Sequence, residues 1–378
     1  MVDDMLELKP FEGATNRTVV VVFLKGRAAR YPVGYQYWRK RDGVGSIGFD
    51  TPYEEITSAK VTFRAWHAQP VDPRNPVSAW MTGRRKALAA AERILGPSHY
   101  RAHAGANSGG ANGLYWLEVK GSRPGGLAMV SNITEGAKRD FPSIQAAIEA
   151  ELLYPLLRGR DVAKWKATPS ASILMVQDPQ TRRGIAEERM ERDFPKAHAY
   201  LARHEKILRS RAAFRRYYRD EDPYWSMFNV SPFTFAKWKV VWREQASDFT
   251  AAVIDAVDGR PIVPDHKLML VPLKTKKEAN FLCGALNSAP CRFIVSAYAV
   301  SISMDTHILE NVAVPEFDES KSAHIRLADL CDSAHKAAAK ENDAEVREIE
   351  TEIDKAAAKL WGLSDGELAE INRSLGEM

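Results

Sequence analysis

The sequence predicts an α+β fold with three parts: a strand segment at the N-terminus, a mixed α/β middle and a helical C-terminal segment. The run from Val19 to Leu24 is continuous, apolar and rich in valine, as strands buried on both faces are. The middle contains strand patterns at residues 114–119 and 268–273. Residues 327–360 repeat apolar side chains at heptad-like spacing, which indicates an intramolecular helical hairpin.

The N-terminal strand needs neighbours that the residues before it cannot supply. A long apolar strand left at a sheet edge is a template for aggregation, and burying each valine or leucine contributes about 1.5–3 kcal/mol. Cover for residues 19–24 must come from residues 27–80 folding back, from a second copy of the chain or from a separate chain. We favour an intermolecular partner.

Proline and glycine residues mark the element boundaries in residues 27–130. Residues 27–80 hold five prolines among aromatic and turn residues, which predicts a linker with short strands. Lys86 to Leu95 has the pattern of a helix that ends at Gly96. Residues 100–130 predict β structure interrupted by a glycine-rich loop from Gly105 to Gly113.

A basic turn stands out at residues 148–165. The leucines at 152, 153, 156 and 157 predict one apolar face of a short helix, which Gly159 would end. Arg158, Arg160 and Lys164 then crowd the exposed end beside Trp165. This chemistry suits an anion such as phosphate, and the alternative is a solvated basic turn.

Residues 197–219 predict one basic helix. Arg211, Arg215 and Arg219 recur at a spacing of four residues and so would share one face. A solvated charged face with internal pairing to Glu205 is a slightly better explanation for these arginines than direct contact with DNA. Residues 276–286 predict another helix, after the strand at 268–273.

The charge distribution is more informative than the net charge of +4. Residues 151–220 contain sixteen Lys and Arg against nine Asp and Glu, whereas residues 318–378 contain eight against fifteen. The basic middle could therefore face a polyanion, and the acidic end solvent or protein.

Several segments, in this order and spacing, resemble one protein family. They are residues 8–18, the run 19–26, the loop region 100–116, the basic turn 148–165 and the segments 281–288, 311–315 and 352–363. Together they are similar to the C-terminal target-recognition half of adenine-specific (N6) DNA methyltransferases of the type IIG restriction–modification class. The resemblance implies the last strand of a catalytic sheet at 1–26, a linker at 27–98, a target-recognition domain at 99–317 and a helical appendage at 318–378.

The motifs of the family's catalytic half are absent. Neither its Gly-rich cofactor turn nor its Asn-Pro-Pro-Tyr-type tetrapeptide occurs. Gly43, Gly45 and Gly48 fit a G-x-G-x-x-G spacing, but the turn-like residues 49–52 follow instead of a helix. The nearest tetrapeptide match, residues 229–233, has a single proline and an extra residue. We therefore expect no catalytic residue and no cofactor in this chain, with S-adenosylmethionine only on a separate catalytic domain.

Metal chemistry is not indicated either. Glu118 and Lys120 have the E-x-K spacing of metal-dependent nucleases, but no aspartate lies between Asp72 and Glu118 to complete the ligand set. A half-buried strand with both side chains facing water explains the pattern better. Three cysteines without a C-x-x-C pair suggest neither a disulfide framework nor a zinc site.

The loop from Gly105 to Gly113 is the candidate for direct base reading. Its glycines let the backbone approach another surface closely. Asn107, Ser108 and Asn112 can donate and accept hydrogen bonds at base edges, and Tyr115 follows as a stacking group. The alternative is a flexible turn between strands.

The predicted function is a sequence-specific DNA-recognition module that positions duplex DNA for N6-adenine methylation by a catalytic domain absent from this chain. Arg158, Arg160 and Lys164 would contact phosphate, and the loop residues would select the sequence. The partners implied are double-stranded DNA and a catalytic methyltransferase chain, or self-association through residues 19–24. The alternatives are a protein-interaction subunit of a defence complex and an enzyme with an unrecognised active site. Apolar runs are too short for a membrane span, so the predicted location is cytoplasmic.

Overall fold

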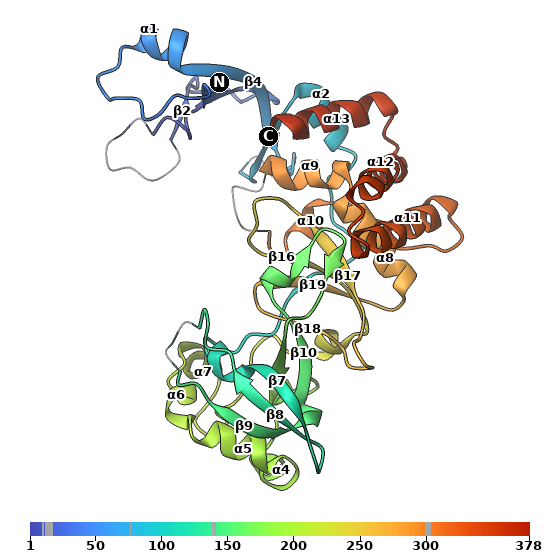
Figure 1. The fold of residues 1–378 in the computed structure, drawn as a ribbon. Coiled ribbons are helices and arrows are strands. Elements are labelled where there is room, and N and C mark those ends of the chain that lie inside the picture. The colour runs from blue at the N-terminus through green and yellow to red at the C-terminus, as the bar shows by residue number, and fades with distance from the viewer. Residues whose placement is uncertain (10, 12–17, 76, 138, 140, 299–303) are drawn as a thin grey trace.

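The computed structural model describes residues 1–9, 11, 18–75, 77–137, 139, 141–298 and 304–378. The fold is α+β, as predicted, with several separate sheets and a group of C-terminal helices (Figure 1). Most of the motif at 8–18 that carried part of the family resemblance lies outside the described residues.

The N-terminal sheet has five strands in the order β2-β1-β3-β4-β5. Their bounds are β1 Val2–Asp4, β2 Val19–Val21, β3 Val33–Lys40, β4 Val61–Pro70 and β5 Trp80–Gly83, with the short helices α1 Tyr53–Glu55 and η1 Ile56–Lys60 before β4. The region predicted to be a linker therefore supplies the longest strands of this sheet. Its prolines are compatible with strands because Pro32 precedes β3 and Pro70 ends β4.

Strand β2 lies at the edge of this sheet and is exposed. It pairs antiparallel with β1 alone, and its three valines are 44–51% exposed. Phe23 and Leu24, just beyond it, are 80% and 68% exposed. A strand forms here as predicted, but the predicted burial on both faces is wrong for the described residues. The cause is topological, because residues 27–80 extend the sheet from the other side of β1.

A six-stranded sheet occupies the middle of the chain, in the order β18-β10-β13-β7-β8-β9. Its strands are β7 Trp116–Arg123, β8 Leu127–Asn132, β9 Gln145–Glu149, β10 Leu153–Leu157, β13 Ala171–Leu174 and β18 Val263–Pro264. The helices α3 Asn112–Tyr115, α4 Glu187–Asp193, α5 Pro195–Ala202, α6 Glu205–Arg209 and α7 Ala212–Tyr217 share its apolar core. As predicted, Glu118 and Lys120 are exposed on β7, where they form an ion pair.

The segment predicted to be a helix at 148–158 is instead a short 3₁₀ turn, η2 Ala150–Leu152, followed by strand β10. The physical reason is Pro155, which lacks an N–H and disfavours helical geometry at Tyr154. Strand β10 pairs antiparallel with β13, from Leu153 opposite Leu174. Leu156 and Leu157 are fully buried in two different cores, because consecutive side chains of a strand point to opposite faces.

The single basic helix predicted at 197–219 is three short helices, α5, α6 and α7. The chain breaks between α6 and α7 at Arg211, which is fully buried. Arg215 and Arg219 are exposed. These three arginines therefore do not share a face.

A four-stranded sheet, β17-β16-β19-β6, packs beneath the C-terminal helices. Its strands are β6 His103–Ala104, β16 Trp238–Arg243, β17 Ala251–Ile254 and β19 Leu268–Leu273; the helices are α2 Arg85–Ala91, α8 Lys276–Asn287, α9 Ala289–Tyr298, α10 Ile308–Asn311, α11 Ser322–Ala339, α12 Asp343–Leu360 and α13 Asp365–Glu377. The predicted strand at 268–273, the helix at 276–286 and the helical hairpin α11–α12 are confirmed. Short pairs complete the described chain: β11 Val162–Ala163 with β12 Lys166–Ala167, and β14 Gln177–Asp178 with β15 Arg183–Gly184, together with the turns η3 Gly159–Asp161 and η4 Pro232–Phe235.

Among the described residues, no helix combines the length and the hydropathy that crossing a bilayer requires.

We expect the isolated chain to self-associate through β2, because an exposed apolar edge pairs readily with another strand. Val20→Lys should reduce the association by placing a charge on that edge, whereas Val257→Lys, at a 41% exposed valine far along the chain, should not. Sedimentation velocity over a concentration series measures this. A wild-type chain that stays monomeric throughout would contradict the expectation.

Candidate functional site

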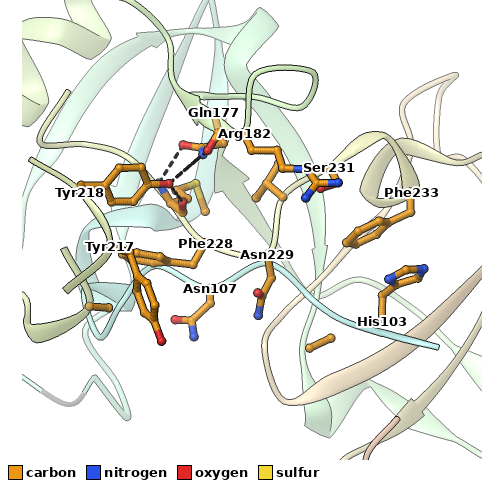
Figure 2. Close-up of a pocket in the computed structure, with 14 residues that line it drawn as sticks. His103, Asn107, Gln177, Arg182, Tyr217, Tyr218, Phe228, Asn229, Ser231 and Phe233 are labelled. Carbon is orange, nitrogen blue, oxygen red and sulfur yellow. Dashed lines mark hydrogen bonds between the residues drawn. The ribbon is translucent and has the colours of Figure 1, made fainter. Parts of the chain in front are cut away.

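A concave site of about 540 Å³ lies where four segments of the chain meet. They are β6 with the loop after it, the β14–β15 hairpin, α7 and residues 227–233. These segments are far apart in sequence, and β6 reaches the site as the edge strand of the four-stranded sheet. Figure 2 shows the side chains that line the site.

Aromatic rings stand on two sides of the site. On one side His103 stacks on Phe233, with ring centroids 4.1 Å apart and planes 11° apart. On the other side Tyr217 meets Phe228 edge to face at 6.1 Å. Tyr217 is 63% exposed, so much of its ring is open to solvent at the edge of the cavity.

Two carboxamides, those of Asn107 and Asn229, lie between these aromatic walls (Figure 2). The Asn107 oxygen accepts a 2.7 Å hydrogen bond from the Gly109 N–H, which leaves the amide nitrogen free to donate. Asn229 has a left-handed backbone, with φ of +56°, and its side chain has no hydrogen-bond partner within the described part of the chain. The site therefore presents unused donors and an unused acceptor.

Uncompensated positive charge surrounds these groups. Arg182, at a φ of +57°, lines the site, and the Arg216 guanidinium lies 5.2 Å from the centre of the Tyr217 ring. The pKa of His103 is lowered by burial and by the nearby charges of Arg101 and Arg182. Over the described residues, none of these arginines forms an ion pair and no carboxylate lines the site. The arrangement can hold an anion that carries a flat ring with polar edges.

Arg211 holds the floor of the site together. It is fully buried and donates to four backbone carbonyls: Leu208 at 2.8 Å, Ser108 at 2.6 Å, Tyr224 at 2.6 Å and Ser226 at 2.9 Å. Burial lowers the pKa of its guanidinium. These bonds join the glycine-rich loop to the segment that carries Phe228 and Asn229, so one side chain positions Asn107 relative to the Phe228 wall.

Glycine is required where this loop meets its neighbours. A Cβ on Gly105 would lie 2.1 Å from the Asp265 carbonyl oxygen, which the backbone cannot accommodate. Gly109 has a φ of +68°, and a Cβ there would lie 2.8 Å from the Phe228 ring. The loop is thus a packed segment and not the flexible turn considered above.

The predicted phosphate contacts are mostly engaged inside the protein. Arg158 is buried, donates to Ser170 at 2.6 Å and lies 3.7 Å from Asp161. Lys164 pairs with Glu350 of α12 at 2.7 Å. Arg160 is exposed and pairs with an exposed carboxylate, that of Glu135, at 3.6 Å. Within the fold, the charges of Arg158 and Lys164 are therefore paired with carboxylates, and phosphate binding by these residues stays a prediction.

Of the predicted base-reading residues, Asn107 alone lines the site. Ser108 is buried and its hydroxyl donates to Asn112. Tyr115 is fully buried and its hydroxyl donates to the Trp225 carbonyl at 2.7 Å. Burial raises the pKa of Tyr115 to about 12. Ser108, Asn112 and Tyr115 therefore form hydrogen bonds within the protein that hold the loop in place.

Sequence reasoning missed most of the lining residues. His103, Arg182 and Tyr217 occur in unremarkable local patterns, and only tertiary folding brings them together. One signal existed, since residues 229–233 were singled out as the nearest match to the family tetrapeptide. Asn229, Ser231 and Phe233 of that segment line the site.

A second cluster of reactive side chains lies between α8 and α11. The ligand atoms of Cys283, Cys331 and His335 are within 4.8 Å of one another. However, the Val253 N–H donates to Nε2 of His335 at 3.0 Å, and Nδ1 lies 2.9 Å from the Cys331 carbonyl. The imidazole therefore carries its proton on Nδ1 and offers no lone pair to a metal, so hydrogen bonding accounts for this cluster.

No family model matches the chain, and no curated protein matches it. Among solved structures, the chain is similar to the type IIL restriction-modification enzyme MmeI in complex with DNA, at 11% identity and a TM-score of 0.47. The alignment covers 92% of this chain and 41% of that one. This chain thus spans well under half the length of that enzyme.

Arg211→Leu should destabilise the protein by about 3 kcal/mol or more, because it leaves three buried carbonyls, those of Ser108, Tyr224 and Ser226, without their donor. Arg215→Leu, at an exposed arginine in the same segment, should change stability by less than about 0.5 kcal/mol. Urea unfolding of both variants measures the difference. Similar losses in the two variants would contradict the structural role of Arg211.

Lys239 provides a test by pH. It is buried in β16, donates to the carbonyls of Ala236 and Ile262, and so anchors the turn that carries Phe233. Burial lowers the pKa of Lys239 to about 7, below its unfolded value near 10.5. The folded state therefore binds fewer protons between pH 7 and 10.5, and stability rises with pH in that window.

Relative to the wild type, Lys239→Met should therefore gain about 1 kcal/mol or more as the pH falls from 10 to 6. The measured quantity is the difference in unfolding free energy between the two proteins at each pH. A difference that does not change with pH would show that the buried amine keeps an ordinary pKa.

Proposed function

We propose that this chain is a sequence-specific DNA-recognition module of a restriction–modification system that methylates adenine, with the concave site at residues 103–107 and 227–233 as its DNA contact. The observation that carries the proposal is the combination in one cavity of the exposed Tyr217 ring, the carboxamides of Asn107 and Asn229, and the unpaired Arg182. Nucleic acids offer the matching groups: base faces that stack, base edges that pair with amides, and phosphates.

The residues that we propose for phosphate contact and for base reading differ from those predicted from the sequence. We assign the phosphate contacts to Arg182, which lines the site, and to Arg101 and Arg216, whose charges lie near His103 and Tyr217. None of the three has a carboxylate partner among the described residues. Asn107 and Asn229 are the base-reading candidates, since a carboxamide can bond two atoms of an adenine edge. Arg158 and Lys164 form ion pairs with Asp161 and Glu350 inside the protein.

The catalytic step is assigned to another domain or chain. The family resemblance in the sequence includes no cofactor turn, so S-adenosylmethionine binding and methyl transfer belong with a catalytic partner. The exposed apolar strand β2 is a surface on which such a partner, or a second copy, would pair.

A protein-interaction subunit of a defence complex is the second candidate. Internal pairing within the basic segment favours it, because Arg158, Arg160, Lys164, Arg183 and Arg209 all contact acidic side chains. Such pairing removes most of the positive field that the sequence suggested. The unpaired arginines at the concave site keep DNA the stronger candidate.

Selection from a random duplex library, followed by binding titrations at several salt concentrations, tests the proposal. Arg182→Ala or Arg216→Ala should flatten the log–log salt slope by about 0.9 with the sequence preference unchanged. Asn107→Ala or Asn229→Ala should relax the preference at one base pair and cost about 1–3 kcal/mol there. Arg347→Ala, at an exposed arginine on the acidic helix α12, serves as the control and should do neither.

If the selection enriches no sequence and the measured DNA affinity does not depend on salt, the result would favour the protein-interaction alternative.

A further inference from the structure

The shape of the site carries more information than its chemistry alone. A duplex presents its base edges inside a groove, and proteins read them with projecting elements such as a helix or a two-stranded ribbon. Here the reading groups lie in a hollow of about 540 Å³, the size of a small-molecule pocket. Asn107 is half-buried and Asn229 is exposed, and both side chains lie between the aromatic walls (Figure 2). A concave site of this size matches one flat ring that has left its stack better than base edges held inside a groove.

The walls are suited to a ring that has left its stack. Tyr217 presents an exposed face at the rim, and the stacked pair of His103 and Phe233 forms the opposite side. Aromatic side chains bind unstacked bases through their faces, largely without regard to base identity. The Arg216 guanidinium lies over the Tyr217 ring, 5.2 Å from its centre, and adds positive charge to this wall, which would attract a phosphate.

Two residues that line the cavity have strained backbone conformations. Arg182 and Asn229 are both non-glycine residues in the left-handed region, and both line the site. Such conformations cost free energy and persist where the surrounding structure enforces them, often at sites that bind a ligand. In this fold they turn a guanidinium and a carboxamide toward one cavity.

We propose that this cavity binds a single unpaired nucleobase of DNA, stacked against Tyr217 and bonded at its edge by Asn107 and Asn229. The proposal rests on the proposed function, since it names the state of the DNA that the site takes. It implies that the module prefers DNA in which one base is already displaced.

The experiment compares a fully paired duplex with the same duplex carrying one extra, unpaired 2-aminopurine. Displacing a base from a paired duplex costs free energy, and this cost is absent for a bulged base. We expect the full-length chain to bind the bulged duplex about tenfold more tightly and to quench the fluorescence of the unpaired base by stacking. Tyr217→Ala should abolish both effects, whereas Tyr217→Phe should retain them.

Tyr53→Ala is the matched control, because Tyr53 is 64% exposed, as Tyr217 is 63% exposed, and lies in the N-terminal part of the chain. Its preference and quenching should equal those of the wild type. Circular dichroism and thermal unfolding confirm that each variant is folded.

The outcomes separate the two proposals. If neither duplex binds, the proposed function fails, and this inference with it. If the paired and bulged duplexes bind equally, DNA recognition stands and the base-binding cavity is overturned. If Tyr217→Ala keeps the preference, the bulge is recognised through DNA bending elsewhere on the protein, which also overturns the inference.

Discussion

The buried guanidinium of Arg211 is the interaction on which the candidate site depends. Its donors reach four carbonyls from three stretches of chain, and no carboxylate among the described residues is bonded to it. A buried charge is tolerated only where its hydrogen bonds are made, so these carbonyls and the arginine need one another. Once they are in place, the glycine-rich loop, the segment 224–229 and the start of α7 have one relative arrangement. The floor and one aromatic wall of the cavity follow from it.

The basic turn at 158–165 shows how charge can serve packing. Lys164 and Trp165 both reach Glu350 on α12, although nearly two hundred residues separate these positions in the chain. The oppositely charged segments found in the sequence therefore meet within the molecule at this point. Partly buried pairs of this kind fix the relative position of two elements more than they add stability. Around the concave site, by contrast, Arg182 has no ion-pair partner among the described residues.

The N-terminal sheet and the central cavity pose different physical problems. Strand β2 exposes apolar side chains that water disfavours, and its edge N–H and C=O groups are free to pair on one side. The cavity instead exposes polar groups, such as the Asn229 carboxamide, that have no hydrogen-bond partner among the described residues. One surface is suited to another protein strand, and the other to a flat, charged ligand. A module that joins a partner protein to nucleic acid needs both kinds of surface.

Sequence by itself determined the elements whose pattern is local. The strand at 268–273, the helix that begins at Lys276 and the C-terminal hairpin were predicted because apolar periodicity alone specifies them. It also located the loop that forms part of the site, through Asn107. Prediction failed at 148–158, where a leucine pattern shared by helix and strand was decided by Pro155 and by pairing with β13.

Only the tertiary structure decided which charges and amides remain available. Arg158, Ser108 and Tyr115 have the right chemistry for DNA, but their burial and their bonds to nearby groups commit them to the fold. His103, Arg182 and Tyr217 became candidates because segments distant in sequence converge on one cavity. Residue type fixes what a side chain can do, whereas its availability depends on long-range contacts, which no local pattern encodes.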